Sequence, residues 1–200
     1  MRMDVHTTDI ENDLQELFKM IREEGHNKQW VLVRRLRDKG AVPDDQIIEL
    51  LDRDEVHPVV KTEICFWLKE ARITEKVYLH KFRFSERQTL AFIPTKVPEL
   101  MEDEVFSEID YILGDVEHEN TTMYRILEEV LYRYAYVMYP LVPPFKDVEY
   151  IAQAIIEVGA DSLEIDRPAP KHRYQSEAKI RHYRDHISKC QSLYISVIPV

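Results

Sequence analysis

Glycine is scarce in this chain, with four residues in 200. Antiparallel β proteins place glycine in their many turns, so this scarcity argues against an all-β fold. It also excludes glycine-rich phosphate-binding loops, because neither G-x-x-x-x-G-K nor G-x-G-x-x-G occurs. Serine nucleophile elbows and C-x-x-C pairs are absent as well. The composition, with 32% charged residues, predicts a mainly α protein whose helices have solvated faces.

Cysteines and long apolar runs are also rare. Cys65 and Cys190 are the two cysteines, and they lie far apart in the sequence. No stretch approaches the roughly 18 apolar residues that span a bilayer, and the first residues contain no apolar run typical of a secretory signal. We therefore expect a cytoplasmic protein without a membrane span.

The net charge of -10 argues against general nucleic-acid binding, which depends on neutralising phosphates with lysine and arginine. The charge is unevenly distributed. Residues 99–129 contain eleven acidic residues and one basic residue, whereas residues 167–190 contain seven basic and two acidic residues. Such blocks are typical of solvated helix faces. A contact between the acidic middle and the basic end, or a patch for a charged partner, remain as alternatives.

The first third of the chain has the apolar period of helices. It predicts helices over residues 8–24, 27–40, 44–51 and 58–71, which form two helix pairs. Thr8 and Glu11 have the spacing of a capping box, Gly25 can close the first helix in a left-handed conformation, and His57 precedes Pro58 at the start of the fourth. Trp30 and Trp67 occupy apolar positions, so we expect both in the core.

From residue 76 to residue 93 the apolar period changes to two, which predicts one β-hairpin. A lone hairpin is marginally stable in water, so one of its faces must lie on helices. We expect this to be the aromatic face, formed by Tyr78, Phe82, Phe84 and Phe92.

The second half returns to helical periodicity. An acidic helix starts at Pro98 or Glu102 and ends near Gly114, and a largely apolar helix covers about residues 122–139. The latter has a buried stripe of Leu127, Leu131, Tyr134 and Met138 and a second stripe of tyrosines. A further helix extends from Val148 to Gly159.

The last 40 residues differ in composition. Residues 161–171 read as a linker, residues 174–190 as a basic helix, and residues 192–200 as an extended apolar tail. An exposed apolar tail favours aggregation, so we expect it to dock on this chain or on another subunit, the latter giving a homodimer. The predicted domains are therefore residues 1–160, with the helices and hairpin, and residues 161–200.

The best candidate metal ligands are His182, His186 and Cys190, which are four residues apart on one predicted helix. Imidazole and thiolate groups bind zinc, but a fourth ligand, Asp185 or His172, has no fixed place. The paired acids Glu104 and Glu108 could serve acid–base chemistry and are more typical of a solvated face. We expect no metal and no cofactor.

Residues 47–69 resemble a HEAT-type repeat, in which a leucine-rich helix and an aspartate-containing corner precede the dipeptide Val60-Lys61. A wider resemblance rests on the motif D-E-x-H-P-x-x-K-T at residues 54–62, on Lys81-Phe82 in the hairpin, and on Ile93-Pro94 and Tyr139-Pro140. In this order the motifs are similar to the C-terminal part of tetratricopeptide-like proteins of Gram-positive bacteria. The resemblance implies a helical-repeat fold in a cytoplasmic bacterial protein, and it brings no catalytic residues. Together with the periodicity it predicts an array of seven or eight helices with one inserted hairpin.

Helix-pair arrays present extended faces to other proteins, so we interpret the chain as a non-enzymatic interaction or scaffold protein with a basic protein partner. Aromatic residues supply much of the binding energy of interfaces, and acidic residues select basic partners. The predicted binding residues are Glu102, Asp103, Glu104, Tyr132, Tyr136 and Tyr139. An enzyme with an acidic or histidine-containing site, or a regulatory module that binds a small ligand, remain as alternatives.

Overall fold

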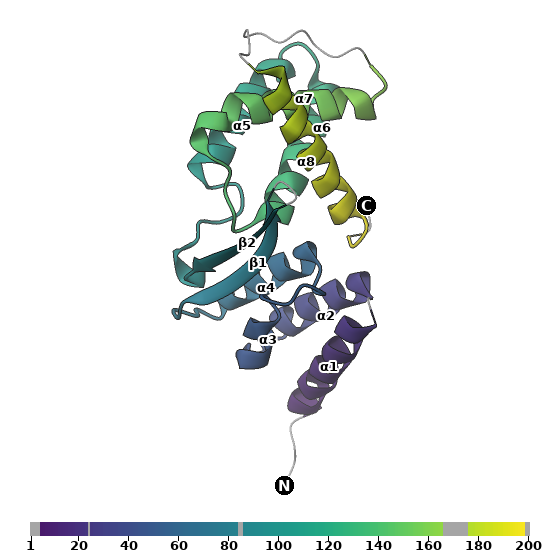
Figure 1. Cartoon of the computed structure of the whole chain (residues 1–200). Helices are drawn as coiled ribbons and strands as arrows, with labels where there is room; N and C mark the ends of the chain where they lie inside the picture. Colours follow the sequence, from purple (N-terminus) through teal and green to yellow (C-terminus); the bar gives the residue numbers. More distant parts are fainter. Residues whose placement is uncertain (1–4, 24, 84–85, 166–175, 199–200) are drawn as a thin grey trace. The chain divides into compact units, whose positions relative to one another are not determined.

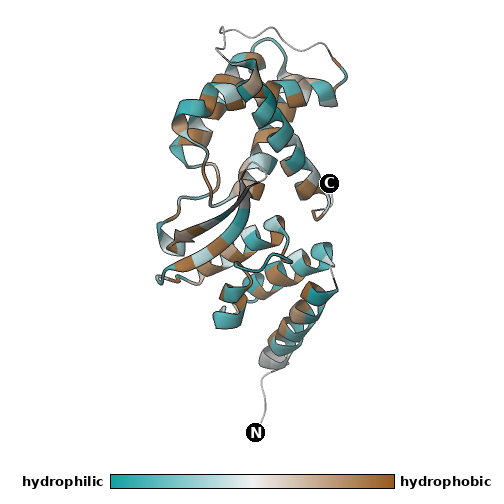
Figure 2. Ribbon diagram, in the orientation of Figure 1, coloured by the Kyte–Doolittle hydropathy of each residue, from teal (hydrophilic) through white to brown (hydrophobic). Residues whose placement is uncertain are grey.

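The computed structural model describes residues 5–23, 25–83, 86–165 and 176–198. These residues form eight α-helices, two short 3₁₀ helices and one two-stranded hairpin (Figure 1). The predicted mainly α fold with one hairpin is therefore confirmed. Both hydrophilic and hydrophobic residues occur along the helices, as expected of amphipathic elements (Figure 2).

The chain divides into two compact units. Unit 1 contains residues 1–82, 87–97 and 195–200, and unit 2 contains residues 83–86 and 98–194. The main division thus lies near residue 97, whereas the sequence analysis placed a boundary at residue 160, which falls inside a helix.

Unit 1 contains α1 (Val5–Arg22), α2 (His26–Asp38), α3 (Asp45–Glu49) and α4 (Pro58–Glu70). Helix α2 packs against both α1 and α4. As predicted, α4 begins at Pro58, and the Nδ1 atom of His57 accepts a hydrogen bond from the Val59 amide. The buried Trp67 indole donates to the Ala41 carbonyl at 2.7 Å, which fixes α4 to the segment after α2.

Three predictions for α1 and α2 were wrong. Thr8 lies inside α1, so it does not cap that helix. Gly25 has φ -80°, and the left-handed glycine of this unit is Gly40, with φ 67°. Trp30 is only half-buried, with the Arg34 guanidinium 5.3 Å from its ring centre. The apolar periodicity of a helix indicates which face points inward, but it does not specify how wide the buried face is.

The hairpin consists of β1 (Val77–Arg83) and β2 (Glu86–Phe92), followed by the 3₁₀ helix η1 (Pro94–Lys96). Its position was predicted correctly, but its buried face was not. Val77, Leu79 and Lys81 are buried, whereas Tyr78 is 56% exposed. Phe82 and Phe84 lie outside the residues whose side chains are described. The inward face includes Lys81, whose ammonium group donates a hydrogen bond to Thr62 Oγ1 on α4. A hydropathy pattern cannot predict that a lysine is buried with such a partner.

Unit 2 contains α5 (Glu104–Glu117), α6 (Thr121–Met138), the 3₁₀ helix η2 (Phe145–Asp147), α7 (Val148–Ser162) and α8 (Glu177–Ile195). Helices α5, α6 and α7 pack against one another. The predicted stripe of α6 is buried: Leu127, Leu131, Tyr134 and Met138.

Two glycines expected to end helices lie inside them. Gly114 is within α5 and Gly159 is within α7. A Cβ atom on Gly159 would lie 2.5 Å from Leu127 Cδ2, so the glycine permits close packing of α7 on α6. The roughly 1 kcal/mol cost of glycine in a helix interior does not stop either helix.

The C-terminal segment also differs from its prediction. Helix α8 continues to Ile195, so residues 192–195 are helical and not extended. Val197 is buried, and its carbonyl accepts a hydrogen bond from the Asn27 side chain within unit 1. Val197 is therefore held by a residue of α2 in the same chain. Most of the predicted linker, residues 166–171, lies outside the described residues.

Candidate functional site

The predicted acidic residues lie at the start of α5. Glu102 and Glu104 are exposed to solvent. Asp103 is the N-cap residue, and its Oδ1 atom accepts a hydrogen bond from the Val105 amide at 2.9 Å. Asp103 thus stabilises the helix, while Glu102 and Glu104 are available to a partner.

A tyrosine that the sequence analysis did not single out lies on the same helix. Tyr111 is 78% exposed. Glu104, Glu108, Tyr111 and Asp115 follow one another at spacings of four, three and four residues, so they share one face of α5. We call these four residues the acidic face of α5. The helical spacing is visible in the sequence, but the exposure of Tyr111 is evident only in the folded chain.

The tyrosine stripe of α6 is mostly internal. Tyr136 and Tyr139 are buried, and the Tyr139 hydroxyl donates to the Pro98 carbonyl at 3.3 Å. Tyr132 is 42% exposed, and its ring lies near the rings of Tyr136 and Tyr194, with centroids 6.1 Å and 6.4 Å away. The prediction that Tyr136 and Tyr139 offer contact area to a partner was therefore wrong, because packing within unit 2 covers both rings.

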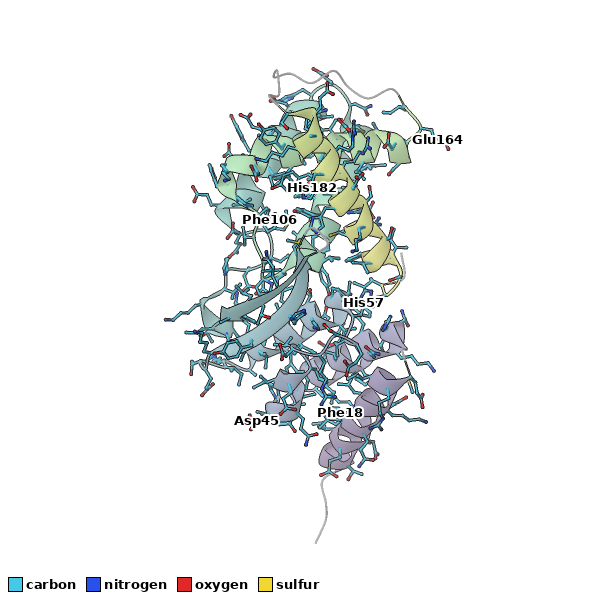
Figure 3. The ribbon with its side chains drawn as sticks, viewed as in Figure 1. Phe18, Asp45, His57, Phe106, Glu164 and His182 are labelled. Atoms are coloured by element: carbon cyan, nitrogen blue, oxygen red, sulfur yellow. The ribbon has the colours of Figure 1, made fainter. Side chains whose placement is uncertain are left out.

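The three candidate metal ligands share α8, but their side chains have different surroundings. His182, which is labelled on α8 in Figure 3, is exposed. His186 and Cys190 are buried. The His186 ring meets the Tyr134 ring edge-on, with centroids 5.7 Å apart. Within the part of the chain that is described, no three His, Cys, Asp or Glu side chains are placed to hold one ion. His172 lies outside that part.

Lys61, Thr62 and Lys81, which belong to the motifs of the tetratricopeptide-like resemblance, come together in unit 1, whereas Tyr139-Pro140 lies in unit 2. Lys61 and Lys81 are each only 2% exposed. Lys81 Nζ donates to Thr62 Oγ1, and Lys61 Nζ donates to the His80 carbonyl, both at 2.7 Å. These two hydrogen bonds link α4 and β1 in opposite directions. Each element contributes one lysine as donor and one oxygen atom as acceptor. These two hydrogen bonds therefore attach the hairpin to α4.

Burial changes the acid–base behaviour of this cluster. It lowers the pKa of Lys61 to about 8, although Asp54 and Asp52 partly oppose the shift. It also lowers the pKa of His57 to about 4, with further contributions from His26 and Lys81. The His57 ring therefore stays neutral at pH 7, as its role as hydrogen-bond acceptor at the start of α4 requires.

A second buried ionic group lies in unit 2. The Asp147 carboxylate accepts hydrogen bonds from Lys179 and from the Tyr183 hydroxyl, the latter at 2.6 Å. Burial raises the pKa of Asp147, but the two hydrogen bonds and the positive charges of Lys179 and Lys146 together outweigh burial and leave the pKa below its usual value. Through Lys179 and Tyr183, Asp147 attaches α8 to η2, so we interpret it as part of a structural ion pair.

Comparison with known proteins gives one similarity. The chain is 28% identical over 136 residues to the TPR repeat-containing protein YsoA of Bacillus subtilis (strain 168). The alignment covers 66% of this chain and 39% of the relative, so the chain spans well under half of that protein's length. No family model and no solved structure matches.

The similarity confirms the predicted resemblance to a tetratricopeptide-like protein of Gram-positive bacteria, and the helical architecture agrees with it. The HEAT-type resemblance of residues 47–69 stays a prediction. No helix in the described ranges has the length and apolar character needed to cross a bilayer. The chain is thus a mainly helical protein that is similar in sequence to a TPR repeat-containing protein.

Proposed function

We propose that this chain is a non-enzymatic protein-interaction module, and that the acidic face of α5, together with the exposed Glu102 just before the helix, binds a basic segment of a cytoplasmic partner. The observation that carries the proposal is the exposure of Tyr111 between carboxylates on one helix face. The similarity to a TPR repeat-containing protein supports an interaction role.

The chemistry of this face suits a cationic partner. Tyrosine supplies a large contact area at low entropic cost and can stack with a guanidinium group. The carboxylates around it attract a basic partner and increase its association rate, an effect that salt screens. Affinity should therefore fall as the ionic strength rises.

The test starts from the native chain as bait in an affinity pull-down with mass spectrometry, followed by calorimetry with each purified partner. Tyr111→Ala removes the aromatic contact, and Glu102→Lys with Glu104→Lys reverses two exposed charges. Asp103 is left unchanged because it caps α5. We expect each variant to weaken binding about tenfold or more, which corresponds to about 1.4 kcal/mol.

The matched control is Asp45→Lys, which reverses an exposed charge on α3 in unit 1 (Figure 3). This variant should bind as the native chain does. Equal affinity for the native chain, Tyr111→Ala and the double charge reversal, with all three folded, would contradict binding through the acidic face of α5.

A further inference from the structure

The outer edge of β1 is already occupied. The His80 amide donates to the Leu51 carbonyl at 2.9 Å, and the His80 carbonyl accepts from Lys61 Nζ. Both backbone groups of His80 therefore point away from β2. The segment after α3 and the first turns of α4 cover this edge.

The same observation fixes the direction of the backbone groups in β2. His80 lies opposite Thr89, because His80 Nδ1 and Thr89 Oγ1 are 3.2 Å apart. Since the backbone groups of His80 point outward, this is a pair without hydrogen bonds between the two strands. The N–H and C=O groups of Thr89 must then point away from β1, and those of Ala91, two residues on, must do the same.

The outer edge of β2 is open in the part of the chain that the structure describes. The backbone groups of Thr89 and Ala91 have no hydrogen-bond partner on this side, and both residues are exposed. Leu90 and Phe92, on the inner face, are only half-buried, while Leu79 on β1 is fully buried. The inner apolar face of the hairpin is therefore fully buried at Leu79 on β1 but only partly covered on β2.

Exposed strand edges are usually protected by lysine, proline or a bulge. The charged residues of β2, Glu86 and Arg87, lie at its start, and residues 88–92 contain no charged residue and no proline. The last five residues of this edge thus have outward hydrogen-bonding groups, an apolar inner flank and no charged or proline residue that would deter an added strand.

We propose that the outer edge of β2 binds an extended segment of a partner protein by strand addition. The segment has apolar side chains at alternate positions, which extend the inner face beside Leu90 and Phe92, and its backbone bonds to Thr89 and Ala91. A second copy of the chain is disfavoured because an edge of about five residues buries much less than the roughly 1,000 Å² of a stable interface. This surface lies in unit 1 and does not depend on the acidic face of α5.

The test uses the isotope-labelled full chain and a synthetic peptide, Lys-Val-Thr-Val-Thr-Val-Lys with blocked ends, as the probe. In the free chain the amide of His80 should exchange slowly with solvent and those of Thr89 and Ala91 quickly. The peptide should shift the Thr89 and Ala91 amide resonances and slow their exchange. A peptide of the same composition without alternation, and one with methylated backbone nitrogens, should bind at least about tenfold more weakly.

Thr89→Pro provides the matching change in the protein. It removes an outward N–H group without removing a hydrogen bond between β1 and β2, so the hairpin should remain and peptide binding should be lost. Thr89→Val is the control: it removes the contact with His80 but keeps the amide, and it should bind the peptide. Equal binding of the three peptides would overturn the proposal, as would unchanged binding to Thr89→Pro. Slow exchange at Thr89 in a free chain with the mass of a dimer would also overturn it, since a second copy would then occupy the edge.

Discussion

The interiors of the two units differ in polarity. Among the described residues, unit 1 buries Asp13, Gln29, His57, Lys61, Thr62, Glu63 and Lys81, whereas unit 2 buries Asp147, Gln153 and His186. In unit 1 the polar groups form cross-links, such as the 2.6 Å ion pair of Arg37 with Glu63 and the crossed lysine bonds under the hairpin. Unit 2 depends mainly on apolar and aromatic packing around α6.

The stability of unit 1 should therefore depend more strongly on protonation than that of unit 2, which rests mainly on apolar packing. The units can be followed separately, because both tryptophans, Trp30 and Trp67, lie in unit 1. Tryptophan fluorescence therefore reports the unfolding of unit 1. Amide resonances of α6 and α7 report that of unit 2.

The largest expected effect is acid destabilisation of unit 1 through His57. Its pKa is about 4 in the folded chain against 6.5 as its usual value, so folding disfavours the protonated ring. The stabilisation is complete above pH 6.5 and is lost as the pH falls to about 4, by up to about 3 kcal/mol. Urea unfolding followed by tryptophan fluorescence should show this loss.

The matched variant is His57→Ser, since serine also caps helices but does not titrate. Its unfolding free energy should change less between pH 6.5 and pH 4 than that of the native chain. Asp147 in unit 2 affects stability in a different pH range. Its pKa is lowered in the folded chain, so its contribution to the unfolding free energy is complete above pH 3.8, the usual pKa of the group, and is lost only at lower pH. A native-like pH dependence in His57→Ser would show that other groups cause the acid sensitivity.

A smaller effect is expected from the two helical glycines of unit 2. Gly159→Ala should lower the unfolding free energy by about 1 to 3 kcal/mol, because its Cβ atom collides with Leu127. Gly114→Ala, with nothing within 4 Å of its Cβ position, should raise it by about 0.5 to 1 kcal/mol. Urea unfolding followed by the amide resonances of α6 tests both. Changes of the same sign in the two variants would contradict the close packing of α7 on α6.

Lys61→Met should stabilise unit 1 by about 1 kcal/mol at pH 7. The folded chain holds a buried ammonium group whose pKa is lowered to about 8, so it bears a desolvation cost at pH 7. The variant removes this cost and loses one hydrogen bond to His80, worth about 1 kcal/mol. Lys96→Met, at an exposed lysine, is the control and should leave tryptophan-detected unfolding unchanged. A loss of more than about 2 kcal/mol in Lys61→Met would show that the hydrogen bond matters more than desolvation.

The smallest effect concerns cysteine reactivity. Burial raises the pKa of the Cys65 thiol to about 12, and Cys190 is also buried. Because the thiolate is the reactive form, neither should react with a disulfide reagent near pH 8 in the native chain. Both should react in denaturant. Rapid labelling of one thiol in native protein would show that the corresponding unit opens readily.

The sequence predicted the features that local rules determine. The start of α4 followed from His57 before Pro58, and the position of the hairpin followed from its alternating pattern. The buried face of the hairpin did not follow, because the partner of Lys81 lies on α4 and not in the strand. The end of α8 was missed because a helix can pass through apolar residues when another part of the chain covers them.

The candidate binding surface was predicted only in part. Glu102 and Glu104 are exposed as expected, because charged residues at a helix start rarely enter a core. Tyr136 and Tyr139 are buried, since the same tyrosine suits a core or an interface and only the fold distinguishes the two. Tyr111 became evident from its exposure.

The most direct test of the proposed function is the salt dependence of partner affinity in the native chain and in the Glu102→Lys, Glu104→Lys double variant. We expect the dissociation constant of the native chain to rise severalfold between about 50 and about 300 mM salt, and that of the variant to rise much less. Equal salt dependence in both proteins would contradict binding through the acidic face of α5.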